Sequence, residues 1–183
     1  DGGSRLLWRF PPRRLEAEAI RDNILLAAGT LDSRMGGPGF SGFRVEAENV
    51  RHYHAKASYG PADWRRMLYM TKVRQEREPT FGVFDCPDFN QTAPSRSRST
   101  TPLQSLSLLN SPFVLQQAGL LAKRLRHEAG ADTRTQVARA CQLALGREPT
   151  REELADANRL VAEHSLEAFC RALFNANEFL FLP

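Results

Sequence analysis

Three shortages in the sequence exclude whole classes of protein: there are few cysteines, few lysines and no long hydrophobic segment. The cysteines are Cys86, Cys141 and Cys170, and they form neither a C-x-x-C pair nor the C-x-x-C-H string that attaches a c-type haem. We therefore expect no cofactor in this chain. Cys141 and Cys170 fall on apolar faces of predicted helices, which predicts that both are buried.

Membrane and catalytic signatures are missing as well. No apolar run approaches the ~20 residues of a membrane-spanning helix, so the sequence predicts no membrane span. There is no signal peptide, and the chain begins at Asp1 rather than at a methionine, which indicates a cut end. The sequence has no G-x-S-x-G, no H-E-x-x-H and no histidine in a triad string, so it does not identify an enzyme reaction.

The residues that are present indicate a folded, mildly basic domain. Of the 183 residues, 42% are hydrophobic and 25% are charged, and the formal net charge is +4. A chain of this length and composition can bury a core as one domain. The string SRSRS (95–99) is of the kind found in nucleic-acid binders. Because the net charge is modest and no reader motif is present, we expect no nucleic-acid partner.

Helical periodicity and capping residues predict a mainly α fold. The first predicted helix has an apolar stripe at helical spacing and an opposite polar face that includes Arg14 and Arg21. Later helices have clear start signals, such as a proline after Thr101 and a capping box that begins at Thr150. The expected helices span about residues 13–29, 102–109, 112–127, 133–145, 151–163 and 166–177.

The stretch between the first helix and the later ones is predicted to be irregular. Short strands are expected at 43–46 and at 64–70, the second with Leu68 and Met70, or their neighbours, inward. The glycine-rich string 35–39 lacks the lysine and the strand–loop–helix context of a phosphate-binding loop, so it indicates a plain turn. The prediction is a compact bundle of short helices, with a long irregular central loop region and at most a small β element.

The chain divides into three parts: the lead and first helix (1–33), the irregular part (34–101) and the helical bundle (102–183). These parts form either a single domain or the C-terminal half of a larger domain. In the first case, apolar lead residues such as Leu6 and Trp8 pack on the domain, together with Leu7. In the second case they lie exposed, or contact another segment.

The candidate site lies in the long central loop and consists of Asp85, Asp88, Arg96 and Arg98. One interpretation is a structural clamp, in which carboxylate–guanidinium pairs hold the loop against the start of the next helix. The other is a site for a hard cation such as calcium, with the Asn90 oxygen joining the two carboxylates. We favour the clamp, because it accounts for all four charged residues.

His52 and His54 are a weaker candidate for a metal site. On a strand, both imidazoles would point to one face, as a metal site requires. No third ligand is indicated nearby, so we favour solvated or packed histidines.

Seven strings, taken in order, resemble one family. They are RLEAEAIRD (14–22), MGGP (35–38), FDCPD (84–88), TTPLQ (100–104), LLN (108–110), LGREPT (145–150) and NANEF (175–179). Together they resemble the planctomycete-type, cytochrome-associated domain of unknown function 1553, over nearly the whole chain. The resemblance implies a large exported or periplasmic protein, of whose domain this chain is the C-terminal half. It also implies that other domains of the same polypeptide are its partners, and that a c-type haem would belong to an upstream module.

These observations favour a non-catalytic scaffold or ligand-binding module of a larger exported, cytochrome-associated protein. The alternative is part of a catalytic domain, redox or carbohydrate-active, whose other half lies upstream. Asp85 and Asp88 could serve glycoside hydrolysis only at a carboxylate separation that their spacing in sequence does not give.

Overall fold

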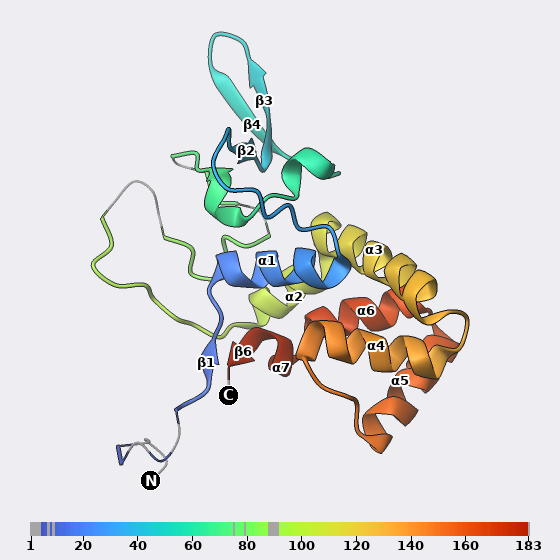
Figure 1. Ribbon diagram of the computed structural model, residues 1–183. Coiled ribbons are helices and arrows are strands. Elements are labelled where there is room, and N and C mark those ends of the chain that lie inside the picture. Colours follow the sequence, from blue (N-terminus) through green and yellow to red (C-terminus); the bar gives the residue numbers. More distant parts are fainter. Residues whose placement is uncertain are drawn as a thin grey trace.

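The computed structural model describes residues 5–6, 8, 10–74, 76–78, 80–87 and 92–182. Within this part of the chain, seven α-helices and three two-stranded sheets confirm the mainly α prediction (Figure 1). The helices are α1 (Ala17–Ala28), α2 (Pro102–Asn110), α3 (Pro112–Ala129), α4 (Thr133–Leu145), α5 (Arg151–Glu163), α6 (Leu166–Phe174) and α7 (Asn177–Leu180). Of these helices, none is both long enough and apolar enough to cross a membrane.

The strands are short, and each pairs with one other. They are β1 (Arg13–Arg14), β2 (Phe40–Ser41), β3 (Phe43–Ala47), β4 (Arg51–Ala55), β5 (Met70–Thr71) and β6 (Phe181–Leu182). β1 pairs antiparallel with β6, β2 pairs parallel with β5, and β3 pairs antiparallel with β4. Two 3₁₀ helices, η1 (Pro61–Asp63) and η2 (Met67–Tyr69), lie between β4 and β5.

The predicted helices after residue 101 agree closely with α2 to α6. α4 and α5 have the predicted limits. The capping box of α5 is present, because the Glu153 N–H donates to Thr150 Oγ1 (3.2 Å) and the Thr150 N–H donates to Glu153 Oε2 (2.7 Å). The last predicted helix is instead divided, since α6 ends at Phe174 and α7 begins at Asn177.

The first predicted helix is wrong at its start, where β1 takes the place of the first turn. Arg14 lies opposite Phe181 of β6, and the Leu15 N–H donates to the Leu180 oxygen (2.8 Å). This segment therefore takes its backbone partners from the end of the chain rather than from its own helix. α1 ends at Gly29, whose φ of 75° is the left-handed conformation that glycine adopts without strain.

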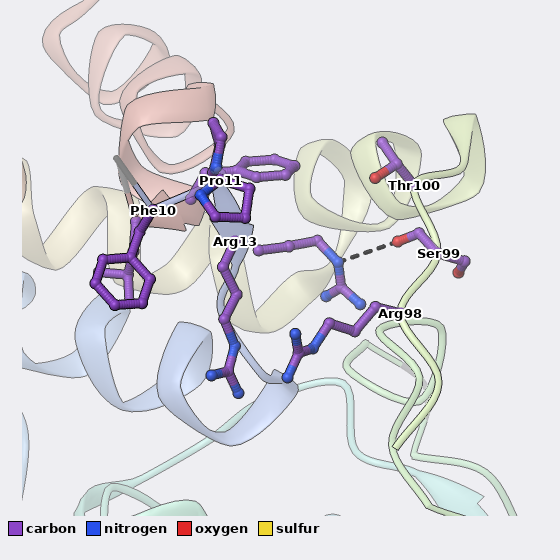
Figure 2. Close-up of a pocket in the computed structure, with 10 residues that line it drawn as sticks. Phe10, Pro11, Arg13, Arg98, Ser99 and Thr100 are labelled. Atoms are coloured by element: carbon purple, nitrogen blue, oxygen red, sulfur yellow. Dashed lines mark hydrogen bonds between the residues drawn. The ribbon is translucent and has the colours of Figure 1, made fainter. Parts of the chain in front are cut away.

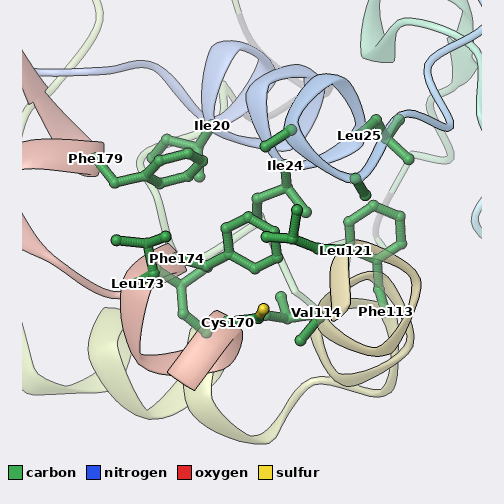
Figure 3. Close-up of a cluster of buried hydrophobic side chains, with 14 of the residues drawn as sticks. Ile20, Ile24, Leu25, Phe113, Val114, Leu121, Cys170, Leu173, Phe174 and Phe179 are labelled. Carbon is green, nitrogen blue, oxygen red and sulfur yellow. The ribbon is translucent and has the colours of Figure 1, made fainter. Parts of the chain in front are cut away.

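α3 lies at the centre of the bundle and packs against α1, α4 and α6. Figure 3 shows Ile20 and Ile24 of α1 near Leu121 of α3 and Phe174 of α6, and all four side chains are fully buried. Burying a side chain of this size stabilises the fold by about 1.5–3 kcal/mol. The core thus fixes α1 relative to the C-terminal helices.

Arg21 lies in the interior, and its predicted place on the polar face of α1 is wrong. It is 2% exposed, and its guanidinium carbon lies 4.8 Å from the centre of the Phe40 ring and 5.1 Å from that of Phe113. It donates to the backbone oxygens of Arg65 (2.8 Å) and Asp63 (2.5 Å). Burial lowers the pKa of Arg21 to about 10. This arginine therefore attaches the irregular region to α1.

The irregular region contains the first predicted strand but not most of the second. Residues 43–46 lie in β3, whose hairpin with β4 projects from the body (Figure 1). In the second predicted strand, residues 64–70, η2 takes the place of most of the strand. Met67 and Met70 are buried (1% and 7% exposed), while Leu68 is 70% exposed. Neither predicted alternation fits, because Met67 and Met70 are buried together and a 3₁₀ turn does not alternate sides as a strand does.

The glycine-rich turn at 35–39 surrounds the Arg65 guanidinium. This group donates to the backbone oxygens of Arg34 (3.1 Å), Gly36 and Pro38, and its central carbon lies 4.0 Å from the centre of the Tyr69 ring. The Gly36 N–H donates to Tyr69 Oη (2.8 Å). The carbonyl oxygens of the turn thus face a cation, which fits a structural turn and not a phosphate cradle.

Three apolar side chains of the lead that the structure describes are largely exposed. Leu6 is 81% exposed, Trp8 is 62% exposed and Phe10 is 84% exposed. These side chains therefore lack the packing expected of them on the domain, and the choice between a single domain and half of a larger one stays a prediction. Leu7 lies outside the described residues.

Candidate functional site

Asp85 ends a series of turns, residues 80–85, that packs on the helical bundle. Phe81 and Phe84 of these turns are 1% and 2% exposed. Asp85 has a φ of 55°, the one positive value at a non-glycine residue in the described part of the chain. Aspartate adopts this conformation more readily than most residues, because its short side chain can hydrogen-bond locally. The buried turns therefore determine where the Asp85 carboxylate points.

The Asp85 carboxylate is held by Arg14 and Ser99. Arg14 Nη2 donates to Asp85 Oδ2 (2.5 Å), the Ser99 N–H donates to the same oxygen (2.7 Å), and Ser99 Oγ donates to Oδ1 (2.9 Å). Arg14 is 7% exposed, and its guanidinium carbon lies 5.3 Å from the centre of the Phe84 ring. Charge-assisted hydrogen bonds of this kind are roughly twice as strong as neutral ones.

Gln104 connects these residues to the first turn of α2. Its Oε1 accepts from the Thr101 N–H (3.3 Å), as the predicted cap requires, and its Nε2 donates to the backbone oxygens of Val83 (3.0 Å) and Ser99 (3.2 Å). Arg14 Nε donates to the Ser99 oxygen as well (3.1 Å). We call Arg14, Asp85, Ser99 and Gln104 the Asp85 clamp. It joins β1, the turns at 80–85, the end of the central loop and α2.

The clamp lowers the pKa of the Asp85 carboxyl group. Partial removal from water acts to raise this pKa, but the hydrogen bonds from Ser99 and the positive charge of Arg14 together outweigh it. The carboxylate is therefore ionised at neutral pH and serves as an acceptor for the clamp.

Arg96 crosses from the central loop to the first turn of α1, where it forms a second ion-pair group. Its Nη1 donates to Glu16 Oε2 (3.0 Å) and to Glu18 Oε2 (2.8 Å), and we call these three residues the Arg96 bridge. Desolvation acts to raise the pKa of Glu18, but the hydrogen bond from Arg96 and other interactions outweigh it, so this pKa is lowered. The bridge holds the loop on α1 beside the clamp.

Cys86 lies next to the Arg96 bridge and is half-buried. Its Sγ is 3.5 Å from Lys72 Nζ and 3.9 Å from Glu18 Oε1. Burial raises the pKa of this thiol in spite of the lysine, so it is not activated as a nucleophile. Cys141 and Cys170 are buried, as predicted.

The structure differs from the predicted clamp in its arginine. Asp85 pairs with Arg14, and not with Arg96 or Arg98. The physical reason is that the first turn of α1 offers Arg96 two carboxylates, while β1 places Arg14 against Asp85 on the buried side. Asp85, Arg96 and Arg98 do line one small cavity together, so the structure brings them near one another without pairing them. Asp88, the fourth predicted residue, lies outside the described residues.

The position of Asp85 argues against the calcium site, in which this carboxylate would be a ligand. A guanidinium 2.5 Å from Asp85 Oδ2 would repel a cation at that oxygen. Asn90, the third proposed oxygen ligand, also lies outside the described residues.

His52 and His54 lie on β4, a strand that the sequence analysis did not assign, and their side chains share one face of the hairpin. His54 Nε2 is 3.3 Å from Glu46 Oε2 on the neighbouring strand, and both side chains are about half exposed (51% and 55%). Within the described ranges, no group of three His, Cys, Asp or Glu side chains is close enough to hold a metal ion.

An open cavity of about 490 Å³ lies beside the clamp, where β1 and β6 meet residues 98–100 (Figure 2). Its walls combine three arginines, Arg13, Arg14 and Arg98, with two hydroxyl-bearing residues and apolar side chains that include Phe181 and Leu182. We call this cavity the arginine pocket. It is a concave site with a basic side and an apolar side.

Sequence reasoning missed Arg14, Ser99, Glu16 and Glu18. No pattern in a single sequence pairs residues that are 71 or 80 positions apart, as Arg14 with Asp85 and Glu16 with Arg96 are. No local signal placed Arg14 outside the helix, because Pro11 and Pro12 restrict only themselves and the residue before each, and a proline is also common at the first position of a helix.

Comparison with known proteins gives a family match. A family model described as protein of unknown function (DUF1553) matches residues 1–161. Six of the seven strings quoted above lie in this range, and the string at 175–179 follows it. No curated protein matches the chain, and no solved structure does.

Proposed function

The chain belongs to the DUF1553 family of proteins of unknown function, and we propose that it is a non-catalytic scaffold or ligand-binding module of a larger protein. The Asp85 clamp carries this proposal. Asp85 was the most conspicuous candidate for chemistry, and its partners among the described residues, Arg14 and Ser99, are groups that hold the central loop on the bundle. An acid, base or nucleophile must instead be within hydrogen-bond reach of a substrate.

The wider setting of the protein is also part of the proposal. The sequence resemblance supports a planctomycete-type, cytochrome-associated protein that is exported or periplasmic. Its partners are then other domains of the same polypeptide, and a c-type haem belongs to an upstream module. This chain itself supplies no haem-attachment string.

Two exposed apolar features suit contacts with such domains. The β3–β4 hairpin carries Val45 and Val50 (46% and 65% exposed), and the lead carries Trp8 (62% exposed). A lone two-stranded hairpin is marginally stable in water, so a neighbouring surface would stabilise it.

The test uses the full-length gene product, divided into this chain and the remainder. The two polypeptides are expressed separately, mixed and analysed by size-exclusion chromatography. The scaffold role predicts a stable complex, with Soret absorbance contributed by the remainder alone. Failure of the two pieces to associate would contradict the scaffold role. Catalytic activity that is lost in Asp85→Asn while the fold is retained would favour the catalytic alternative.

A further inference from the structure

The Arg98 side chain is not neutralised by any residue that the structure describes. It lines the arginine pocket and has no ion pair or hydrogen bond within the described ranges. The other two arginines there have partners, because Arg14 is paired with Asp85 and Arg13 Nη2 lies 3.6 Å from Glu16 Oε1. No residue that lines the pocket is acidic. The pocket therefore has an excess of positive charge.

The surroundings of Arg98 favour a carboxylate. In Figure 2 the Arg98 side chain extends away from Ser99 and Thr100, and its guanidinium ends near that of Arg13 in this view. A guanidinium presents two parallel N–H donors that match the two oxygens of a carboxylate. The start of α2, immediately after Thr101, adds the partial positive charge of a helix N-terminus.

The opposite side of the pocket is apolar and accessible. Phe10 is 84% exposed and Leu182 is 53% exposed, and Phe181 of β6, which also lines the cavity, is half-buried. Covering these side chains would remove apolar surface from water, which is favourable. A volume of about 490 Å³ is in the usual range for small-molecule sites.

Two other large cavities that are lined by described residues lack this combination. In a cavity of about 470 Å³ along α1, charges of both signs are already paired, such as Arg96 with Glu18 and Arg66 with Asp22. In a cavity of about 400 Å³ at the glycine-rich turn, Arg65 donates to backbone oxygens. An uncompensated guanidinium faces an apolar wall in the arginine pocket.

We infer that the arginine pocket binds a ligand in which a carboxylate is joined to an apolar body. Arg98 binds the carboxylate, and Phe10, Phe181 and Leu182 cover the apolar part. Two sources share this chemistry: a free apolar acid, and the C-terminal carboxylate of a peptide that ends in an apolar residue. The inference goes beyond the scaffold role, and each of the two is tested by a separate experiment.

Isothermal titration calorimetry on the intact chain tests this with two matched pairs of probes. Octanoate and octanol represent a free apolar acid and its neutral counterpart. N-acetylphenylalanine and its amide represent a peptide C-terminus with and without charge. Binding of either acid, at least tenfold tighter than its neutral counterpart, supports the inference, and the tighter acid identifies the source.

Two variants and one control locate the site. Arg98→Gln should weaken binding of the acid by on the order of tenfold or more, since it removes a charge-assisted pair. Leu182→Glu should also weaken it, because a carboxylate on the pocket wall competes for Arg98. Arg134→Gln, at an exposed arginine on α4, should bind as the wild type does. Circular dichroism confirms that each variant is folded.

Three results would overturn the inference. They are no detectable binding of either acid by the wild type, equal binding of the acid and its neutral counterpart, and unchanged binding by folded Arg98→Gln. Because none of these measurements involves the remainder of the polypeptide, they do not bear on the scaffold role.

Discussion

Arg14 and Asp85 lie 71 positions apart in the sequence, and their side chains meet at 2.5 Å, with Arg14 Nη2 donating to Asp85 Oδ2. This contact joins the strand that precedes α1 to the turns that precede α2. Because α1 and α2 both pack on α3, the clamp fixes the central loop to the bundle at both of its ends.

Replacing Asp85 by asparagine should destabilise the protein by about 1–3 kcal/mol, since it removes the charge that Arg14 pairs with in a partly buried place. Asparagine has nearly the same shape and also tolerates a positive φ, so the change removes the charge and one hydrogen-bond acceptor without requiring a new backbone conformation. Urea unfolding followed by circular dichroism measures the effect. Asp156→Asn is the control, because its pair with Arg159 is exposed and should contribute little. Equal effects of the two substitutions would argue against a structural clamp.

The stabilisation by Asp85 should decrease as the pH falls into the acidic range. Its pKa is lower in the folded protein than in the unfolded chain, so its contribution is complete above the unfolded value of about 3.9 and is lost as the pH falls through the lower folded value. The difference in unfolding free energy between the wild type and Asp85→Asn should be constant from pH 7 to about 5 and should shrink below about pH 4. A difference that persists unchanged at the lowest accessible pH would contradict the lowered pKa.

Arg21→Met should be more damaging than any surface arginine substitution. It leaves the buried backbone oxygens of Asp63 and Arg65 without their donor, at a cost of about 2–4 kcal/mol. Differential scanning calorimetry measures the change. Arg159→Met on α5, where the side chain is 67% exposed, should stay within about 0.5 kcal/mol of the wild type. If Arg21→Met is equally mild, Arg21 does not attach the irregular region to α1.

The three thiols should react with iodoacetamide in the order of their exposure. Cys86 is half-buried, Cys141 is 5% exposed and Cys170 is 0% exposed, with burial raising the pKa of Cys170 to about 12. Mass spectrometry of the native protein should find Cys86 alkylated first and Cys170 only after unfolding. Modification of Cys170 at the rate of Cys86 would show that the helical core opens readily.

The helical part of the fold was predictable because its signals are local. Caps at Thr150 and Ser165 and the glycine after Leu145 act within one helical turn, and the structure uses all of them. The position of Arg21 was not predictable, because its burial depends on carbonyl groups more than 40 residues away. Tertiary contacts thus bury Arg21, although its position in the isolated helix is on the polar face.

The sequence predicted a clamp around the Asp85 carboxylate, but it did not identify the arginine that pairs with Asp85. The acidic loop residue Asp85 and the cap at Gln104 were identified, because turn chemistry and capping are visible in the sequence. Arg14 was not identified, because the pairing of β1 with β6 at opposite ends of the chain determines its position. Arg96, which is closer to Asp85 in the sequence, instead pairs with Glu16 and Glu18 at the start of α1.

A double-mutant cycle between Arg14 and Asp85 tests the central claim most directly. The unfolding free energies of the wild type, Arg14→Gln, Asp85→Asn and the double variant give the coupling energy between the two side chains. The clamp predicts a coupling of about 0.5–3 kcal/mol for this pair. The matching cycle with Arg98→Gln should give a coupling near zero. A negligible Arg14–Asp85 coupling, or a larger coupling between Asp85 and Arg98, would contradict the structure of the clamp.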